Sequence, residues 1–181
     1  MPRSSSRGLW FWPVVLTLVV ADIITKRWAE SALQPRGVPR EVFGDGVRLT
    51  LVYNPGAAFG LHLGPWSRWI FLALTVGALF ILARLYMHTR SGERLRALAL
   101  GLVTAGAIGN LLDRITSSIG VVDFIDVGLG DWRWPTFNVA DMAVSVGAIL
   151  LAWVLWGDDK RVAAESAATA RPALSQAPEG Q

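Results

Sequence analysis

Residues 95–114 read LRALALGLVTAGAIGNLLDR, and this stretch decides the class of fold. From Leu95 to Leu112 it is almost entirely apolar or small. A helix needs ~20 such residues to cross the hydrocarbon core of a bilayer. Polar groups then close the stretch, namely Asn110 and the neighbours Asp113 and Arg114. We therefore expect a membrane-spanning helix whose last turn carries charge at one membrane surface.

The rest of the chain has the same character. Of its 181 residues, 52% are hydrophobic and 17% are charged, and the mean hydropathy is +0.41, which favours a membrane protein. Three more segments qualify as spans, at roughly residues 9–25, 69–87 and 139–156. The predicted fold is an all-α membrane protein with four transmembrane helices in one domain, residues 1–157. Small residues repeat in the last two spans and indicate close helix packing: Gly101, Ala105, Gly109, Ala143 and Gly147.

The basic residues give the direction of the spans. They precede the first span, crowd the short second connection and follow the last span: Arg3, Arg7, Arg84, Arg90, Arg94, Arg96, Lys160 and Arg161. By the positive-inside rule both termini are expected in the cytoplasm. The first span is read as retained, because no small-residue cleavage site follows it. Residues 158–181, rich in Ala, Ser and Pro, are predicted to be a disordered cytoplasmic tail.

The connection between the first two spans carries a different pattern. Residues 47–53 alternate apolar and polar side chains, which is typical of a short strand, and Asn54-Pro55-Gly56 reads as a turn. The loop from Trp28 to Trp66 is long and rich in interfacial residues. We expect a small amphipathic, β-containing outer region between the first and second helices.

Polar residues at the ends of the spans converge on one membrane face. With four alternating spans, the exits of the first and third helices and the start of the fourth lie on the same side, which is expected to be the outer one. The residues concerned are Asp22, Lys26, Asn54, Asn110, Asp113, Arg114, Asp123, Asn138 and Asp141. Ionisable groups at membrane level are costly and usually mark a functional site.

Each of these groups also has a purely structural interpretation. Asn138 and Asp141 have the spacing of a capping box that starts the fourth helix. Asp22 and Lys26, four residues apart, could form a helical ion pair. Asp113 is unfavourable at a helix C-terminus unless a cation such as Arg114 compensates it. Solvated loop positions are the default for three others: Asp123, Asp126 and Asp131.

The residue types limit the chemistry. The chain has no cysteine, and its two histidines, His62 and His88, fall on opposite sides of the predicted membrane, so thiol, paired-His metal and His–Ser sites are not expected. Two nearby carboxylates can still hydrolyse a peptide bond, because one is held protonated while the other stays ionised. Spacing nominates five aspartates without ranking them: Asp22, Asp113, Asp123, Asp126 and Asp141.

Four sequence blocks, in order, resemble the signatures of lipoprotein signal peptidase, or signal peptidase II. They are Asn54-Pro55-Gly56-Ala57-Ala58-Phe59-Gly60, Gly109-Asn110-Leu111-Leu112-Asp113-Arg114, Val121-Val122-Asp123-Phe124 and Phe137-Asn138-Val139-Ala140-Asp141. Asp22 and Lys26 also match that family's pattern. One block alone would be weak, but the ordered set is highly specific.

The resemblance implies an aspartic endopeptidase of the bacterial inner membrane, without metal or cofactor, whose site lies at the outer face. Its substrates would be diacylglyceryl-modified prolipoproteins, cut on the N-terminal side of the lipidated cysteine. The catalytic pair would be Asp123 and Asp141. Matching positions that shape the pocket or hold substrate are Asp22, Lys26, Asn54, Gly56, Asn110, Asp113, Arg114 and Asn138. Asp126 stands at a position that varies in the family.

Partners and rival functions follow from the same features. The expected partners are prolipoproteins and membrane lipid, and the chain is expected to act as a monomer. Nucleic acid is not expected, since no basic patch is interleaved with aromatics. The main alternative is an ion-coupled carrier, which would place charges near the midplane and show a repeat. A Ser/Lys peptidase using Lys26 and Ser31 and a non-enzymatic assembly factor are further rivals.

Overall fold

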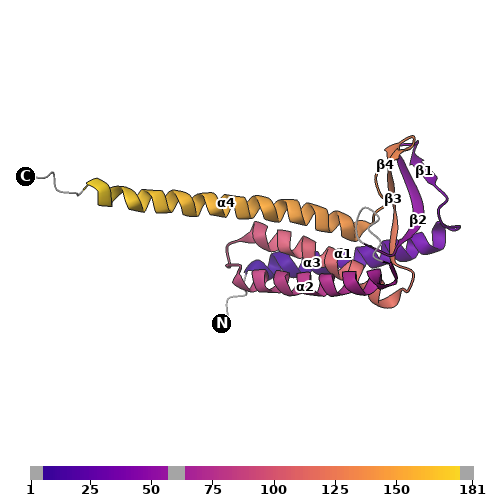
Figure 1. Ribbon diagram of the computed structural model, residues 1–181, viewed down its shortest axis with the longest axis horizontal. Helices are drawn as coiled ribbons and strands as arrows, with labels where there is room; N and C mark the ends of the chain where they lie inside the picture. Colours follow the sequence, from indigo (N-terminus) through magenta and orange to yellow (C-terminus); the bar gives the residue numbers. More distant parts are fainter. Residues whose placement is uncertain (1–5, 57–63, 176–181) are drawn as a thin grey trace, which may run out of the picture.

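The computed structural model describes residues 6–56 and 64–175. Within them the elements follow in the order α1 (Ser6–Ala32), β1 (Arg40–Phe43), β2 (Val47–Asn54), η2 (Gly64–Trp66), α2 (Ser67–His88), α3 (Arg94–Thr116), β3 (Val121–Leu129), β4 (Trp132–Arg133) and α4 (Val139–Ser175). The helices lie roughly along one direction, and the strands gather at one end of them (Figure 1).

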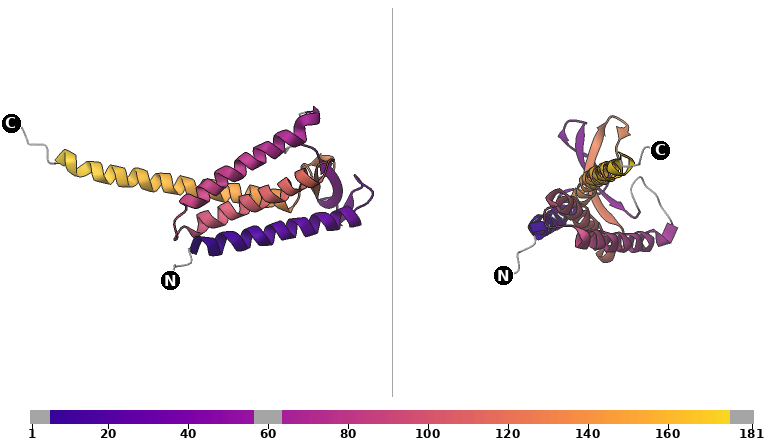
Figure 2. Two further views of the ribbon diagram at one scale, coloured as in Figure 1. Left: turned by 90° about the horizontal axis from the view of Figure 1, so that it is seen from below. Right: turned by 90° about the vertical axis from the view of Figure 1, so that its left-hand side faces the viewer.

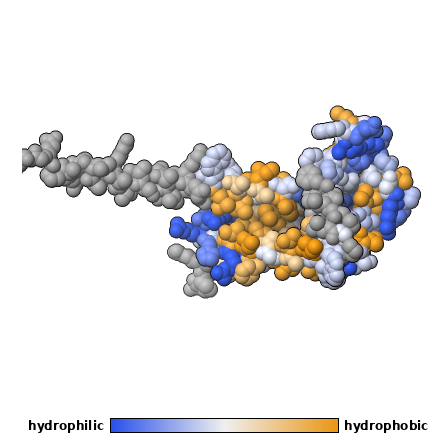
Figure 3. All heavy atoms as spheres, viewed as in Figure 1, coloured by the Kyte–Doolittle hydropathy of each residue, from blue (hydrophilic) through white to orange (hydrophobic). Residues whose placement is uncertain are grey.

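Four helices are long and apolar enough to cross a membrane: Arg7–Ala32, Ser67–His88, Arg94–Thr116 and Val139–Gly157. The predicted count of spans is therefore confirmed. An apolar belt covers the helical part, with hydrophilic surface at both ends (Figure 3). The first helix continues beyond the expected end at residue 25. The charge of Lys26 is compensated by buried carboxylates, so the helix does not need to end there to expose it to water.

The sheet corrects one expectation about the outer region. The predicted strand at residues 47–53 is present as β2, but the β-structure is not confined to the connection between the first two helices. Its order is β1-β2-β3-β4, all antiparallel, so half of the strands come from the connection between α3 and α4. Besides the adjacent β1, β2 pairs with β3, which lies some seventy residues later in the chain, a distance at which local pattern carries no pairing information.

The C-terminal expectation also differs from the structure. Residues 158–175 continue α4 as a helix, where a disordered tail is expected from the sequence. The segment is rich in alanine, the strongest helix former, and it extends a helix that the membrane span has already nucleated. Residues 176–181 lie outside the described part of the chain, as do residues 57–63 with the Ala57–Gly60 half of the first block.

Two apolar clusters hold the fold, one at each end of α1. Phe11 and Val15 pack with Leu82 and Leu100 at the end away from the sheet. Ala29 and Leu33 pack with the inner face of the sheet, on Leu51, Val122 and Phe124. Between these clusters α1 buries the polar residues Asp22 and Lys26. The fold thus surrounds a polar layer with two apolar ones.

Close helix contacts frame that polar layer. A Cβ atom added at Gly109 of α3 would lie 2.5 Å from Oδ2 of Asp22 and 3.1 Å from Cβ of Ala140. Only glycine allows α1, α3 and α4 to approach so closely here. The packing role expected for the small residues of the last two spans is therefore met at Gly109, as it is at Gly147, which faces Leu102 and Val103.

Candidate active site

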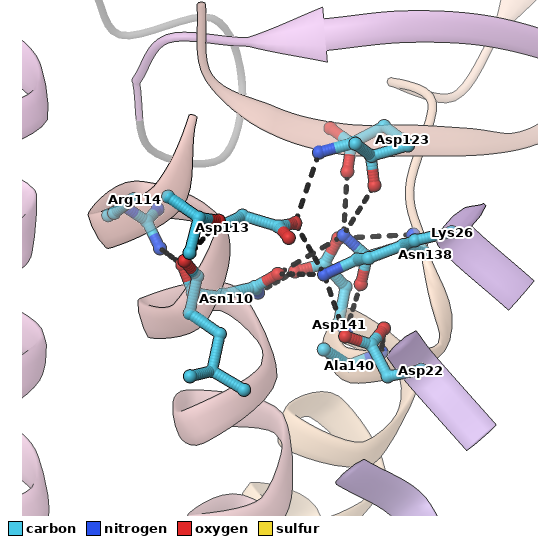
Figure 4. Close-up of polar contacts among 12 residues, drawn as sticks. Asp22, Lys26, Asn110, Asp113, Arg114, Asp123, Asn138, Ala140 and Asp141 are labelled. Carbon is cyan, nitrogen blue, oxygen red and sulfur yellow. Dashed lines mark hydrogen bonds and ion pairs between the residues drawn. The ribbon is translucent and has the colours of Figure 1, made fainter. Parts of the chain in front are cut away.

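Lys26 is the centre of a buried charge cluster, with only 3% of its surface exposed. Its Nζ lies 2.7 Å from Oδ2 of Asp22 and 2.8 Å from Oδ2 of Asp113, and it donates to Oδ1 of Asn110 at 3.2 Å. The expected i, i+4 pair of Asp22 and Lys26 is present. The cation that compensates Asp113, however, is Lys26 from α1 rather than the neighbouring Arg114 (Figure 4).

Asp22 and Asp113 also hold backbone from elsewhere in the chain. Oδ1 of Asp22 accepts a hydrogen bond from the N–H of Ala140 at 2.9 Å, one of the unpaired donors in the first turn of α4. Oδ2 of Asp113 accepts from the N–H of Val122 at 3.2 Å, next to Asp123 in β3. The Lys26 cluster therefore ties α1 and α3 to both segments that carry the predicted catalytic pair.

Asn138 and Asp141 form the reciprocal bonds of a capping box. The Asp141 N–H donates to Oδ1 of Asn138 at 2.9 Å, and the Asn138 N–H donates to Oδ2 of Asp141 at 3.2 Å. The capping interpretation is therefore right. It does not compete with a functional one, because Oδ1 of Asp141 also accepts from Nδ2 of Asn110 at 2.7 Å and the residue lines a cleft.

The side chain of Asn138, fully buried, links the two aspartates. Its Nδ2 donates to Oδ1 of Asp123 at 2.7 Å, and lies 3.2 Å from both the Val122 carbonyl and Oδ1 of Asn110 (Figure 4). The same amide caps Asp141 through its oxygen. Asp123 and Asp141, eighteen positions apart in sequence, are thus held by one side chain.

Asp123 sits in an environment that disfavours its charge. It is 2% exposed and lies outside the membrane-spanning helices, on β3 opposite Val52 of β2. Burial, with a smaller contribution from the charge of Asp141, raises the pKa of Asp123 to about 7, although hydrogen bonds from Asn54 and Asn138 oppose the rise. Near neutral pH this carboxyl is therefore partly protonated and can donate a proton.

Asn54 reaches Asp123 from the connection between α1 and α2. Its Oδ1 accepts from the N–H of Gly56 at 3.0 Å, which fixes the predicted turn, and its side chain is hydrogen-bonded to Asp123. Arg114 comes from the other side, where Nη1 donates to the Asn110 carbonyl at 3.0 Å. Its charge lies within electrostatic reach of Asp141, Asp113 and Asp123.

These residues border a cleft of about 750 Å³, a size typical of ligand pockets. Six predicted site residues line it: Asn54, Gly56, Asn110, Arg114, Asp123 and Asp141. Asp22, Lys26, Asp113 and Asn138 support this wall from behind through the bonds described above. The apolar lining of the cleft was not predicted from the sequence; it includes Val52, Trp134, Phe137, Met142, Val144 and Val146. The Trp134-Pro135-Thr136-Phe137 run just before Asn138 was the available signal.

Asp126 lies elsewhere. Its Oδ1 is 2.6 Å from Nε of Arg133 and its Oδ2 accepts from the Thr50 hydroxyl at 3.0 Å, so it braces the sheet. Asp131 is exposed near the β3–β4 turn. Neither residue is among those that line the cleft.

The amino-acid sequence is similar to those of known proteins. The family model of signal peptidase (SPase) II matches residues 14–157. A lipoprotein signal peptidase of Hydrogenovibrio crunogenus is 41% identical over 155 residues, covering 83% of this chain and 87% of that one. One from Burkholderia mallei is 48% identical over 106 residues, or 57% of this chain and 62% of that one.

Two solved structures, both described as bacterial membrane enzymes, share the fold. One has a TM-score of 0.73 at 29% identity and covers 82% of this chain and 88% of its own. The other has a TM-score of 0.68 at 30% identity, with coverage of 78% and 89%. With a family match that spans all four apolar helices, the chain belongs to the signal peptidase II family.

Proposed function

We propose that this protein is an aspartic endopeptidase that removes signal peptides from diacylglyceryl-modified prolipoproteins, cutting on the N-terminal side of the lipidated cysteine. Family membership supports signal peptide removal from prolipoproteins. The observation that carries the aspartic mechanism is the buried Asn138 amide, which bonds Asp123 and caps Asp141 at one wall of the cleft.

The two carboxyls have complementary roles. Asp123, with its raised pKa, is the proton donor, and Asp141, in the first turn of α4, is the general base. Asp141 takes a proton from water as the water oxygen bonds to the scissile carbonyl carbon, and Asp123 gives its proton to the carbonyl oxygen. When the C–N bond breaks, Asp141 protonates the leaving amine and Asp123 recovers a proton from a hydroxyl.

The cleft offers different surfaces to different parts of the substrate. Asn54, Asn110 and Arg114 present amide and guanidinium groups that suit a peptide backbone in extended form. Met142, Val144 and Val146 continue the wall along α4, at the level of the membrane span. This apolar side suits the end of a signal helix and the acyl chains of the lipidated cysteine, both entering from the bilayer.

Membrane placement completes the proposal. The family and the four apolar helices support a multi-pass protein of the bacterial inner membrane. We place both termini in the cytoplasm and the cleft at the outer face, on the strength of the basic residues near the α2–α3 connection: Arg84, Arg90, Arg94 and Arg96. We further propose that the protein acts as a monomer, with bilayer lipid and prolipoprotein as partners. An ion-coupled carrier is not favoured, since Asp113 lies in the last turn of α3, Asp123 on the neighbouring strand β3 and Asp141 in the first turn of α4.

The test is cleavage of a diacylglyceryl-modified precursor by the purified protein in detergent. We expect release of the signal peptide and, by mass spectrometry, a product that begins at the lipidated cysteine. Asp123→Asn and Asp141→Asn should each fold and release nothing. Treatment with a chelator should leave the wild-type rate unchanged.

Two other aspartates of the same sheet serve as controls. Asp131→Asn changes an exposed carboxylate, and Asp126→Asn changes one that braces the sheet, so both should still cut the precursor. Normal cleavage by either Asp123→Asn or Asp141→Asn would refute the aspartate pair. A wild-type protein that leaves the lipidated precursor intact would refute the substrate.

A further inference from the structure

Arg68, in the first turn of α2, contacts the backbone end of α3. Its Nε donates to the Arg114 carbonyl at 2.6 Å and its Nη2 donates to the Ile115 carbonyl at 3.0 Å. The guanidinium carbon also lies 5.1 Å from the ring centroid of Trp69. The neighbouring ring and two acceptors give this side chain a defined position.

The two carbonyls belong to the part of a helix that lacks internal partners. The last four carbonyls of any helix have no N–H to accept from within it. In α3, Asp113 O is satisfied by the Ser117 N–H at 2.7 Å, and Arg68 serves the next two. The positive guanidinium also faces the negative end of the α3 dipole. Arg68 thus stabilises the C-terminal turn of α3 from a different helix.

That turn and the one before it hold the aspartate pair. Asn110 donates to Asp141 at 2.7 Å, and Asp113 accepts from the N–H of Val122, which precedes Asp123. A shift or fraying of the α3 end would loosen both contacts together. The position of the two carboxyls therefore depends on how firmly this end is held.

The apolar contacts of α2 lie toward its C-terminal half. The members that α2 contributes to the apolar cluster on α1 and α3 begin at Leu79 and continue through Leu82, Leu85 and Tyr86. Toward its N-terminal end α2 leans away from the other helices (Figure 2). Arg68 lies in this divergent part and spans the separation with its long side chain.

We propose that Arg68 is a positioning residue for the reaction: by capping the C-terminus of α3 it keeps Asn110 and Asp113 where they hold Asp141 and the strand of Asp123. This inference rests on the proposed peptidase function. In the contacts described, Arg68 touches neither Asp123 nor Asp141. Its effect on the reaction is therefore indirect and depends on the position of the C-terminal end of α3.

The chain supplies a matched control in Arg7. This residue, in the first turns of α1, caps the C-terminus of α2 in the same way, with Nη1 at 3.3 Å from the Tyr86 carbonyl and 3.0 Å from the Met87 carbonyl. It also lies over an aromatic ring, that of Tyr86, at 5.1 Å. Arg7 precedes Asp22 by fifteen helical residues, roughly 22 Å along α1. Arg7 and Arg68 thus each cap the C-terminus of a neighbouring helix, at opposite ends of the bundle.

The experiment compares Arg68→Ala, Arg68→Lys and Arg7→Ala in cleavage of the lipidated precursor. Misplaced catalytic groups can cost ~10²-fold in rate, so we expect Arg68→Ala to lower kcat about 10- to 100-fold with KM within about threefold. Arg68→Lys, which keeps the charge but donates from a single nitrogen, should recover part of kcat. Arg7→Ala should lower the melting temperature comparably and keep kcat within about twofold. Equal losses of kcat in the two alanine variants, or none in Arg68→Ala, would overturn the proposal.

Hydrogen exchange separates this inference from the function on which it rests. Amides in residues 110–124 should exchange faster in Arg68→Ala than in the wild type, while Arg7→Ala leaves them unchanged. This readout does not need a substrate. Faster exchange together with an inactive wild type would sink the proposed function and leave the capping role of Arg68 standing. Unchanged exchange would sink the positioning role even if the wild type cleaves.

Discussion

Nδ2 of Asn138 lies 2.7 Å from Oδ1 of Asp123, while the oxygen of the same amide caps the N–H of Asp141. The side chain is fully buried, so it has no water to replace either partner. Asn138 therefore caps the N-terminus of α4 and also sets the relative position of the Asp123 and Asp141 carboxyl groups. Its two duties can be separated by mutation.

Asn138→Ser should retain the cap and lose the bridge. A serine oxygen can accept the Asp141 N–H but is too short to donate to Asp123 as well. We expect stability within about 1 kcal/mol of the wild type and a kcat reduced ~10²-fold, a loss typical of a removed preorganised donor. Asn138→Ala removes the cap as well as the bridge, so it should lower both the stability and kcat. The measurements are thermal unfolding and single-turnover cleavage, and a fully active serine variant would contradict the bridging role.

The pH profile should follow the raised pKa of Asp123. If the protonated form donates to the carbonyl oxygen, kcat/KM falls tenfold per unit as pH rises above about 7. A pH series of initial rates with the lipidated precursor checks this, and a flat profile from pH 6 to 9 would refute the role of Asp123 as the acid.

Asp123→Asn should be more stable than the wild type at alkaline pH. Because the folded pKa of Asp123 is raised from 3.8 to about 7, the folded state binds the extra proton between these values, so stability is lost as pH rises through that window. The shift corresponds to as much as about 4 kcal/mol above pH 7. Melting curves in detergent at pH 4, 5 and 8 should show the advantage of the variant over the wild type growing as the pH rises.

Lys26→Met should destabilise the protein severely. It would leave the carboxylates of Asp22 and Asp113 without the ammonium that lies 2.7 and 2.8 Å from them, and breaking a buried ion pair costs roughly 3–5 kcal/mol. Adding Asp113→Asn to the methionine variant removes one stranded charge and should restore part of the loss. Melting temperatures of the single and double variants decide the matter; a double variant less stable than the single would contradict the cluster.

Gly109→Ala and Gly77→Ala form a matched pair. At Gly109 a methyl group meets Asp22 and Ala140 at 2.5 and 3.1 Å, and such overpacking costs about 1–3 kcal/mol. At Gly77 of α2 nothing lies within 4 Å, so the better helix propensity of alanine should stabilise by up to about 1 kcal/mol. Melting temperatures that move in the same direction for both variants would count against the close contact of α1, α3 and α4.

Much of this architecture could be predicted from the chain alone, and the reason is physical. Apolar length sufficient to cross a bilayer is a local property, so all four spans can be read from hydropathy. The one strand with a clear alternation, β2, could be read in the same way. The strand that carries Asp123 could not, because it has near-continuous burial and its partner is remote in sequence.

The same distinction between local and long-range information applies to the site. The sequence by itself determined which polar residues stand at the ends of spans on one face, and its ordered blocks nominated Asp123 and Asp141 among five aspartates. Only the tertiary structure decided that Lys26 rather than Arg114 compensates Asp113, that Asn138 joins the two aspartates and that Arg68 holds the end of α3. Hydropathy and motif order are one-dimensional, whereas a pKa near 7 at Asp123 requires burial and a second carboxylate brought together by three helices and a sheet.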